Sequence, residues 1–181
     1  MSVKKEPAGR RSVQVDVAAP GSTQSAVARR SAEAQLRTLI DKFAPAHLRL
    51  IGVARRWLRK RLPTAHEVVY EYRDWFVISY SPNEHGYEGV LVIRASANGV
   101  KLYFNNGREL PDPAKLLQGS GKQTRSLNLE GASTHARPEI VRLVDEAIAR
   151  NRVPFEAAGR GSVVMRSATA KRSAGPGRSS S

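Results

Sequence analysis

The sequence contains no cysteine, and this absence excludes several kinds of site. Disulfide bonds, thiolate nucleophiles, cysteine-ligated zinc and cysteine-held iron–sulfur clusters all require that residue. The four histidines show no metal-ligand spacing, so each is interpreted as a lone surface side chain. A chain without cysteine suits a reducing compartment, and we expect a cytoplasmic protein that carries no cofactor.

Long apolar runs are also absent. No window approaches the roughly 18 apolar residues of a membrane span, so we expect no membrane partner. Residues 1–11 carry positive charge with no apolar run behind them, and we therefore expect no secretory signal.

Acidic residues are scarce relative to basic ones, 16 against 30, which gives a formal net charge of +14. The excess is +3 over residues 1–33, +7 over 34–155 and +4 over 156–181. Residues 1–30 and 156–181 combine small residues and proline with scattered charge, so both are predicted to be disordered basic tails. Such tails bind nucleic acid non-specifically at low salt, although no nucleic-acid-reading motif accompanies them.

Residues 31–155, between the tails, are predicted to form one α+β domain. Apolar residues at helical spacing predict helices over 31–43 and 46–61, and a last helix that begins at Pro138. The second helix ends in the densest basic cluster of the chain, RRWLRKR at 55–61. This cluster is either a solvated helix face whose last-turn cations suit the helix dipole, or a patch that faces an anion.

A third, short helix is predicted over residues 65–70. Thr64 and Glu67 have the spacing of a capping box, in which each side chain bonds to the backbone amide of the other residue. In this interpretation Glu67 has a structural role at the start of the helix.

Beyond this point the apolar period changes from 3.6 to 2, which predicts strands. Asn98 and Gly99 form the strongest short hairpin signal, because both turn positions need positive φ. The fold class predicted is α+β, an antiparallel sheet of about four to five strands with the N-terminal helices and the C-terminal helix packed on it. The strands are expected over 74–80, 89–97, 100–105 and 122–130.

The central stretch, residues 100–129, combines two of these strands with glycine turns. Asp112 is predicted to cap a short helix that Pro113 begins and Gly119 ends. Cations beside these turns predict a site for an anionic small molecule, which would be held by Lys101, Arg108, Lys122 and Arg125.

The segment GSGK at 119–122 resembles the end of a phosphate-binding P-loop, but the rest of that motif is missing. The motif needs glycine where Leu116 stands and serine or threonine where Gln123 stands. No serine has the glycine pattern of a nucleophile elbow. We therefore expect a protein that is not an enzyme.

Two further groups of residues are candidates for sites. The high frequency of aromatic residues in this part of the sequence predicts a pocket lined by Tyr70, Glu71 and Tyr103, although aromatic residues in strands more often belong to the core. Three acidic residues that lie close together in the sequence are the second group, and they form either a weak site for a hard cation, or one capping acid and two solvated acids. The members of this acidic set are Glu67, Glu71 and Asp74.

Three segments resemble the YdhG-like domain family. They are LPTAHEVVY at 62–70, LYFNNGREL at 102–110 and DPAKLLQGSGK at 112–122, together with Arg125, and the resemblance covers roughly residues 36–150. It implies helices packed on an antiparallel sheet. Some members of the family are described as frataxin-like iron chaperones, so the resemblance implies an intracellular iron-binding chaperone as the alternative function. Such chaperones present acidic surfaces, and this basic domain therefore favours a small binding module for an anionic ligand.

Overall fold

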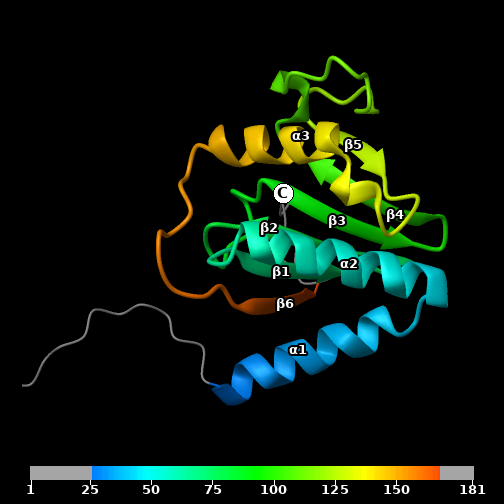
Figure 1. Cartoon of the computed structure of the whole chain (residues 1–181). Helices are drawn as coiled ribbons and strands as arrows, with labels where there is room; N and C mark the ends of the chain where they lie inside the picture. The colour runs from blue at the N-terminus through cyan, green and yellow to red at the C-terminus, as the bar shows by residue number, and fades with distance from the viewer. Residues whose placement is uncertain (1–25, 168–181) are drawn as a thin grey trace, which may run out of the picture.

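The computed structural model describes residues 26–167, and Figure 1 shows how the elements in that range are arranged. The helices there are α1 (Ala26–Ile40), α2 (Pro45–Arg61) and α3 (Pro138–Ala149), with the short 3-10 helices η1 (Gly107–Glu109) and η2 (Thr134–Ala136). No helix within this range is long and apolar enough to cross a membrane. The strands are β1 (His66–Glu71), β2 (Trp75–Ser81), β3 (Leu91–Ser96), β4 (Gly99–Phe104), β5 (Arg125–Asn128) and β6 (Val163–Ser167).

The six strands form one sheet in the order β5-β4-β3-β2-β1-β6. Neighbouring strands are antiparallel except β1 and β6, which run parallel. The predicted α+β class is confirmed. The prediction of a purely antiparallel sheet of four to five strands is wrong, because the sheet is mixed and β1 and β6 were not expected.

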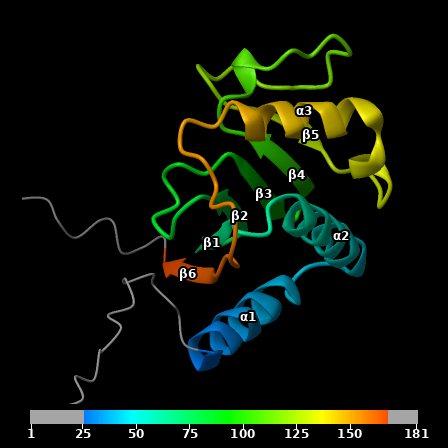
Figure 2. The ribbon, with the colours of Figure 1, turned by 60° about the vertical axis from the view of Figure 1, so that its left-hand side comes forward.

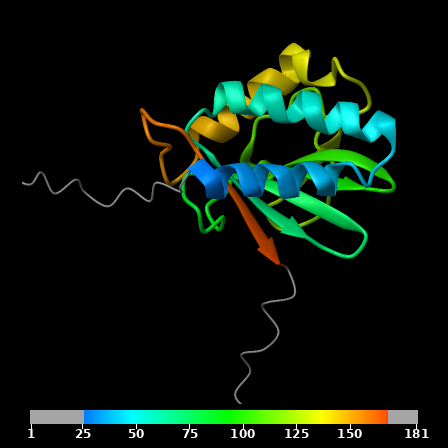
Figure 3. The same cartoon turned by 90° about the horizontal axis from the view of Figure 1, so that it is seen from below.

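The helices lie on one face of this sheet, and none of the described helices lies on the other (Figure 3). Phe76, Ile78 and Tyr80 alternate along β2 and are fully buried in the core beneath the helices. Burying each large apolar side chain stabilises a fold by about 1.5–3 kcal/mol, so this alternation fixes which face of the sheet is covered. Phe43, in the turn between α1 and α2, makes an edge-to-face contact with Phe76 at 5.3 Å between ring centroids.

The segment predicted as a third helix is strand β1 instead. Neither bond of the predicted capping box forms: the Thr64 hydroxyl donates to the Glu156 carbonyl at 2.8 Å, and the Glu67 carboxylate accepts from Arg55 and Arg59. The VVY run at 68–70 is β-branched and aromatic, which favours a strand. Pairing with β2 on one side and β6 on the other then satisfies its backbone.

The short helix predicted to begin at Pro113 is a turn. The Asp112 carboxylate accepts from the backbone amides of Leu116 and Leu117 at 3.0 and 2.7 Å, four and five residues on, whereas a helix cap would accept from the amides two or three residues on. Lys115 has a φ of 52°, in the left-handed region, so the chain leaves the helical path after one turn.

Strand β6 lies within residues 156–181, which were predicted to be a disordered tail, so that prediction is wrong for residues 163–167. β6 runs beside β1 at the edge of the sheet, close to α1 (Figure 2). The Gly161 amide donates to the Pro63 carbonyl at 3.2 Å, and the Glu67 amide donates to the Ser162 carbonyl at 2.8 Å. Helix α1 likewise begins inside the predicted N-terminal tail, whereas residues 1–25 and 168–181 lie outside the described range.

Candidate functional site

A buried carboxylate organises the interior of the sheet's helix-covered face. Glu67 of β1 has a side chain only 3% exposed, and the two arginines of α2 that reach it are Arg55 and Arg59. The Nη2 atom of each donates to Glu67 Oε2 at 2.7 Å, and the Tyr80 hydroxyl donates to Oε1 at 2.9 Å. Glu33 of α1 accepts from both arginines as well, so these residues connect α1, α2 and the sheet.

The ionised state of this network follows from its contacts. Burial works against the charge of Arg55, but the hydrogen bonds that it donates to Glu67 and Glu33, and the negative charge of these carboxylates, raise the pKa of Arg55 above its usual value. Burial, and then the negative charge of Glu67, raise the pKa of Tyr80 well above its usual value. Burial opposes ionisation of Glu33 too, yet hydrogen bonding and charge from Arg55 and Arg59 lower its pKa. Both carboxylates are therefore already engaged by cations.

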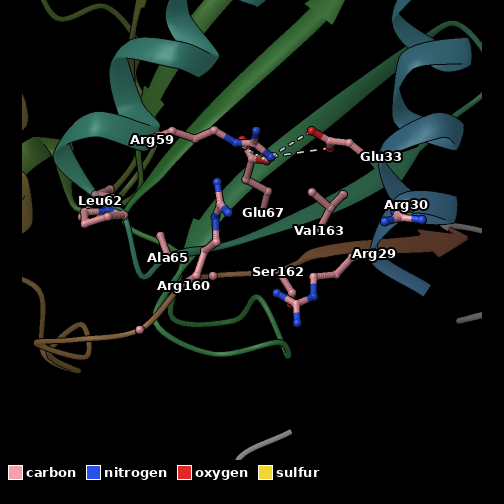
Figure 4. Close-up of a pocket in the computed structure, with 13 residues that line it drawn as sticks. Arg29, Arg30, Glu33, Arg59, Leu62, Ala65, Glu67, Arg160, Ser162 and Val163 are labelled. Atoms are coloured by element: carbon pink, nitrogen blue, oxygen red, sulfur yellow. Dashed lines mark hydrogen bonds and ion pairs between the residues drawn. The ribbon is translucent and has the colours of Figure 1, made fainter. Parts of the chain in front are cut away.

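A cavity of about 480 Å³ opens beside this network, and we call it the arginine pocket. It is formed by α1, by the turn from α2 to β1, and by the segment that leads into β6 (Figure 4). Four arginines line it against two carboxylates, Glu33 and Glu67. The arginines are Arg29, Arg30, Arg59 and Arg160.

The positive charge of the arginine pocket is only partly neutralised. Arg30 and Arg160 have no hydrogen-bond or ion-pair partner within residues 26–167. Arg160 points from the segment before β6 toward Arg59 and Glu67 (Figure 4). Unpaired guanidinium groups around a shared cavity attract an anion and present donors in the planar arrangement that carboxylate and phosphate oxygens accept.

The sequence interpretation missed this pocket. Arg29, Arg30 and Arg160 lie in segments predicted to be tails, and Arg55 and Arg59 lie in a cluster for which a solvated face was the simpler interpretation. The available signal was the single acid at the start of an apolar run, HEVVY, directly after a helix rich in arginine. A carboxylate that begins a buried strand needs a cationic partner.

The four cations predicted to bind an anion are only partly brought together. Arg108 and Arg125 lie near Lys122 in one loop, where their guanidinium groups donate to backbone carbonyls of Lys122, Gly121 and Thr124. Lys101 lies on β4 opposite Asn128, whereas Arg125 pairs with Phe104, so the side chains of Lys101 and Arg125 leave the sheet on opposite faces. None of the cavities described in residues 26–167 is lined by any of the four, and the loop site stays a prediction.

The predicted pocket residues lie apart from one another. Tyr70 is on β1 and Tyr103 on β4, with β2 and β3 between them, which separates these strands by about 14 Å. The Tyr70 hydroxyl donates to the His85 carbonyl at 3.2 Å, and the Tyr103 hydroxyl accepts from Arg94 at 3.3 Å. Glu71 lines a different cavity and accepts from Lys42 at 2.9 Å.

The acidic set is also dispersed. Glu67 and Glu71 lie four residues apart on one strand, about 13 Å, and each is paired with cations. Asp74 lies in the turn after them and shares a cavity with Glu71. Within residues 26–167 no three histidine, aspartate or glutamate side chains group as metal ligands.

Comparison with known proteins adds no relative. The chain matches no family model, no curated protein and no solved structure. The resemblance to the YdhG-like domain family therefore stays a prediction that rests on the three segments quoted above.

Proposed function

We propose that the protein is a small, non-enzymatic binding module for an anionic small molecule, which it holds in the arginine pocket. The observation that carries the proposal is the pair Arg30 and Arg160, which line one cavity with Arg59 and have no partner within the described residues. Cations are seldom collected around a cavity without an anion to balance them, because like charges repel at short range.

The dimensions and chemistry favour a small phosphate or carboxylate compound. A volume of about 480 Å³ is within the usual range of small-molecule sites, roughly 300–1,000 Å³. Arginine binds planar oxygen pairs in two parallel hydrogen bonds. Arg59 is 44% exposed, and its Nε and Nη2 atoms are held by Glu67 and Glu33, which fixes its orientation at the wall of the pocket.

The lining supports a binding role more than a catalytic one. Ser162 is the lining residue with a hydroxyl group, and that oxygen lies 2.8 Å from His66 Nδ1 and 3.1 Å from Glu84. The register pairs Val163 with Glu67, so His66 lies on the opposite face of the sheet from the arginines. The serine therefore fastens β6 and the loop before β3 onto β1.

The test is isothermal titration calorimetry of the whole chain with inorganic pyrophosphate and with citrate. We expect at least one to bind, and Arg160→Ala to weaken binding by about tenfold or more, since a hydrogen bond to a charged group contributes about 1.5–3 kcal/mol. Arg56→Ala is the matched control, because Arg56 is exposed on α2 and has no partner among the described residues. It should leave binding unchanged.

The glycine-loop prediction is tested in the same experiment through Lys122→Glu and Arg125→Glu. If these variants lose binding and Arg160→Ala does not, the ligand lies in the loop and the arginine pocket is not the site. Equal losses in Arg160→Ala and Arg56→Ala would show attraction by net charge alone and would contradict the proposal.

A further inference from the structure

The face of the sheet that lies away from the helices carries a separate group of side chains. Directly paired residues of neighbouring strands point to the same face, so the registers place Arg166, Tyr70, Val77, Arg94, Lys101 and Asn128 in one row across all six strands. None of the residues on this face of the six strands is acidic. The loop between β2 and β3 covers one end of the face, where Gly86 packs on Val68 and Gly89 packs on Ser79.

The uncovered end holds what we call the open-face patch, which consists of Tyr72, Trp75, Arg94, Lys101 and Tyr103. Arg94 and Lys101 are direct cross-strand partners, and neither has a carboxylate partner within residues 26–167. The Arg94 guanidinium lies over the Trp75 ring at 4.4 Å and donates to the Tyr103 hydroxyl at 3.3 Å. Its Nε is buried without a hydrogen-bond partner.

This arrangement costs the isolated protein stability. Like charges placed directly opposite each other on neighbouring strands are destabilising. A phosphate placed above Arg94 and Lys101 would remove that repulsion. The patch is thus electrostatically complementary to a polyanion.

Aromatic rings give the patch a second property. Tyr72 stacks on Trp75 with 3.7 Å between centroids and an angle of 10° between planes. Tyr72 and Arg94 lie only 3.7 and 4.4 Å from the Trp75 ring, too close for both to share one face of the indole. Trp75 therefore lies between them, and Tyr72 covers the face of the indole that points away from Arg94. Tyr72 is 38% exposed and lies at the edge of the sheet, directly after β1, where it also lines the cavity that contains Glu71, so part of its surface is open to stack with a nucleobase.

We propose that the open-face patch binds single-stranded nucleic acid, with phosphates at Arg94 and Lys101 and a base stacked on Tyr72. Single-stranded chains present both phosphates and unstacked bases, whereas a duplex presents its phosphates with the bases already stacked. This binding goes beyond the proposed small-molecule function and uses the opposite face of the sheet.

Fluorescence anisotropy of a labelled twelve-nucleotide oligo(dT), titrated with the whole chain, tests the proposal. Lys101→Glu removes a cation from the proposed phosphate site and Tyr72→Ala removes the stacking ring, so each is expected to weaken binding at least about fivefold. Tyr72→Phe keeps the ring and should bind as the wild type does. Lys60→Glu makes the same charge change on an exposed, unpartnered lysine of α2 and should alter affinity less than twofold.

Loss of structure would not explain the expected result, because Lys101→Glu replaces a repulsive pair with an attractive one. Its melting temperature should equal or exceed that of the wild type. If Lys60→Glu weakens binding of the oligonucleotide as much as Lys101→Glu does, the net positive charge of the whole chain binds the oligonucleotide, and the proposal is overturned. Unchanged binding by Tyr72→Ala, or equally strong competition from duplex DNA or heparin, would also overturn it.

Discussion

Replacing Glu67 with glutamine removes the charge at the centre of the protein's polar interior while keeping the shape of the side chain. In the wild type, Glu67 accepts hydrogen bonds from Arg55, Arg59 and Tyr80. Glutamine keeps one acceptor oxygen and places an amide donor where an arginine donor now points. Arg55, with a side chain only 15% exposed, would then keep Glu33 as its carboxylate partner.

The expected cost is about 3 kcal/mol. Removing one partner from a buried ion pair costs about 3–5 kcal/mol, because the remaining charge stays away from water. The low end applies because Glu33 continues to pair with both arginines and Arg59 is 44% exposed. Against a typical stability of about 5–15 kcal/mol, the variant should still fold.

Urea denaturation followed by circular dichroism measures this cost, with Glu71→Gln as the matched control. Glu71 lies on the same strand and face as Glu67, but its pair with Lys42 is exposed, so its loss should cost less than about 1 kcal/mol. If the two variants have the same midpoint and slope, the buried network does not stabilise the fold and the reasoning is refuted.

Two further predictions concern the same region. Because the folded protein raises the pKa of Tyr80, it favours the neutral hydroxyl, so this stabilisation is complete below about pH 10 and is lost as the pH rises further. In an absorbance titration at 295 nm, one tyrosine of the wild type should ionise late, together with unfolding, and Tyr80→Phe should lack this late step. If the curve of Tyr80→Phe differs from that of the wild type only near pH 10, the prediction is contradicted. Gly161→Ala should destabilise the protein by about 1–3 kcal/mol and abolish pyrophosphate binding, because its methyl group would lie 1.7 Å from the Ala65 carbonyl oxygen and push β6 away. Gly121→Ala meets only ordinary contacts, and a loss of the same size there would count against the clash.

The sequence predicted those elements whose signal is local. The apolar spacing of the three α-helices, and the Asn98-Gly99 turn between β3 and β4, lie within each segment and are present in the structure. Strand β1 was missed because the Thr64–Glu67 spacing also fits a helix start. The β-branched residues of this segment favour a strand, but the contacts that decide between the two, with the arginines of α2 and with strands β2 and β6, come from elsewhere in the chain.

The sequence signals a cationic partner for Glu67, but it could not predict the full set of residues that line the arginine pocket, for the same reason. Its cations come from α1, from α2 and from the segment before β6, so no sequence window contains them together. The glycine turns near Lys122 offered a local pattern instead, but the structure directs Arg108 and Arg125 to carbonyls of their own loop. The excess of basic residues in the sequence predicts an anionic ligand, whereas the cavity that could hold this ligand is seen only in the fold.

The most direct test of the anion site is a proton–nitrogen correlation NMR titration of the whole chain with inorganic pyrophosphate. We expect the first signals to move to be those of the backbone amides of Gly159 and Gly161 and of the Nε–H of Arg160, all at the arginine pocket. Movement confined to Gly119, Gly121 and Arg125, or uniform small shifts of all arginine signals, would contradict this expectation.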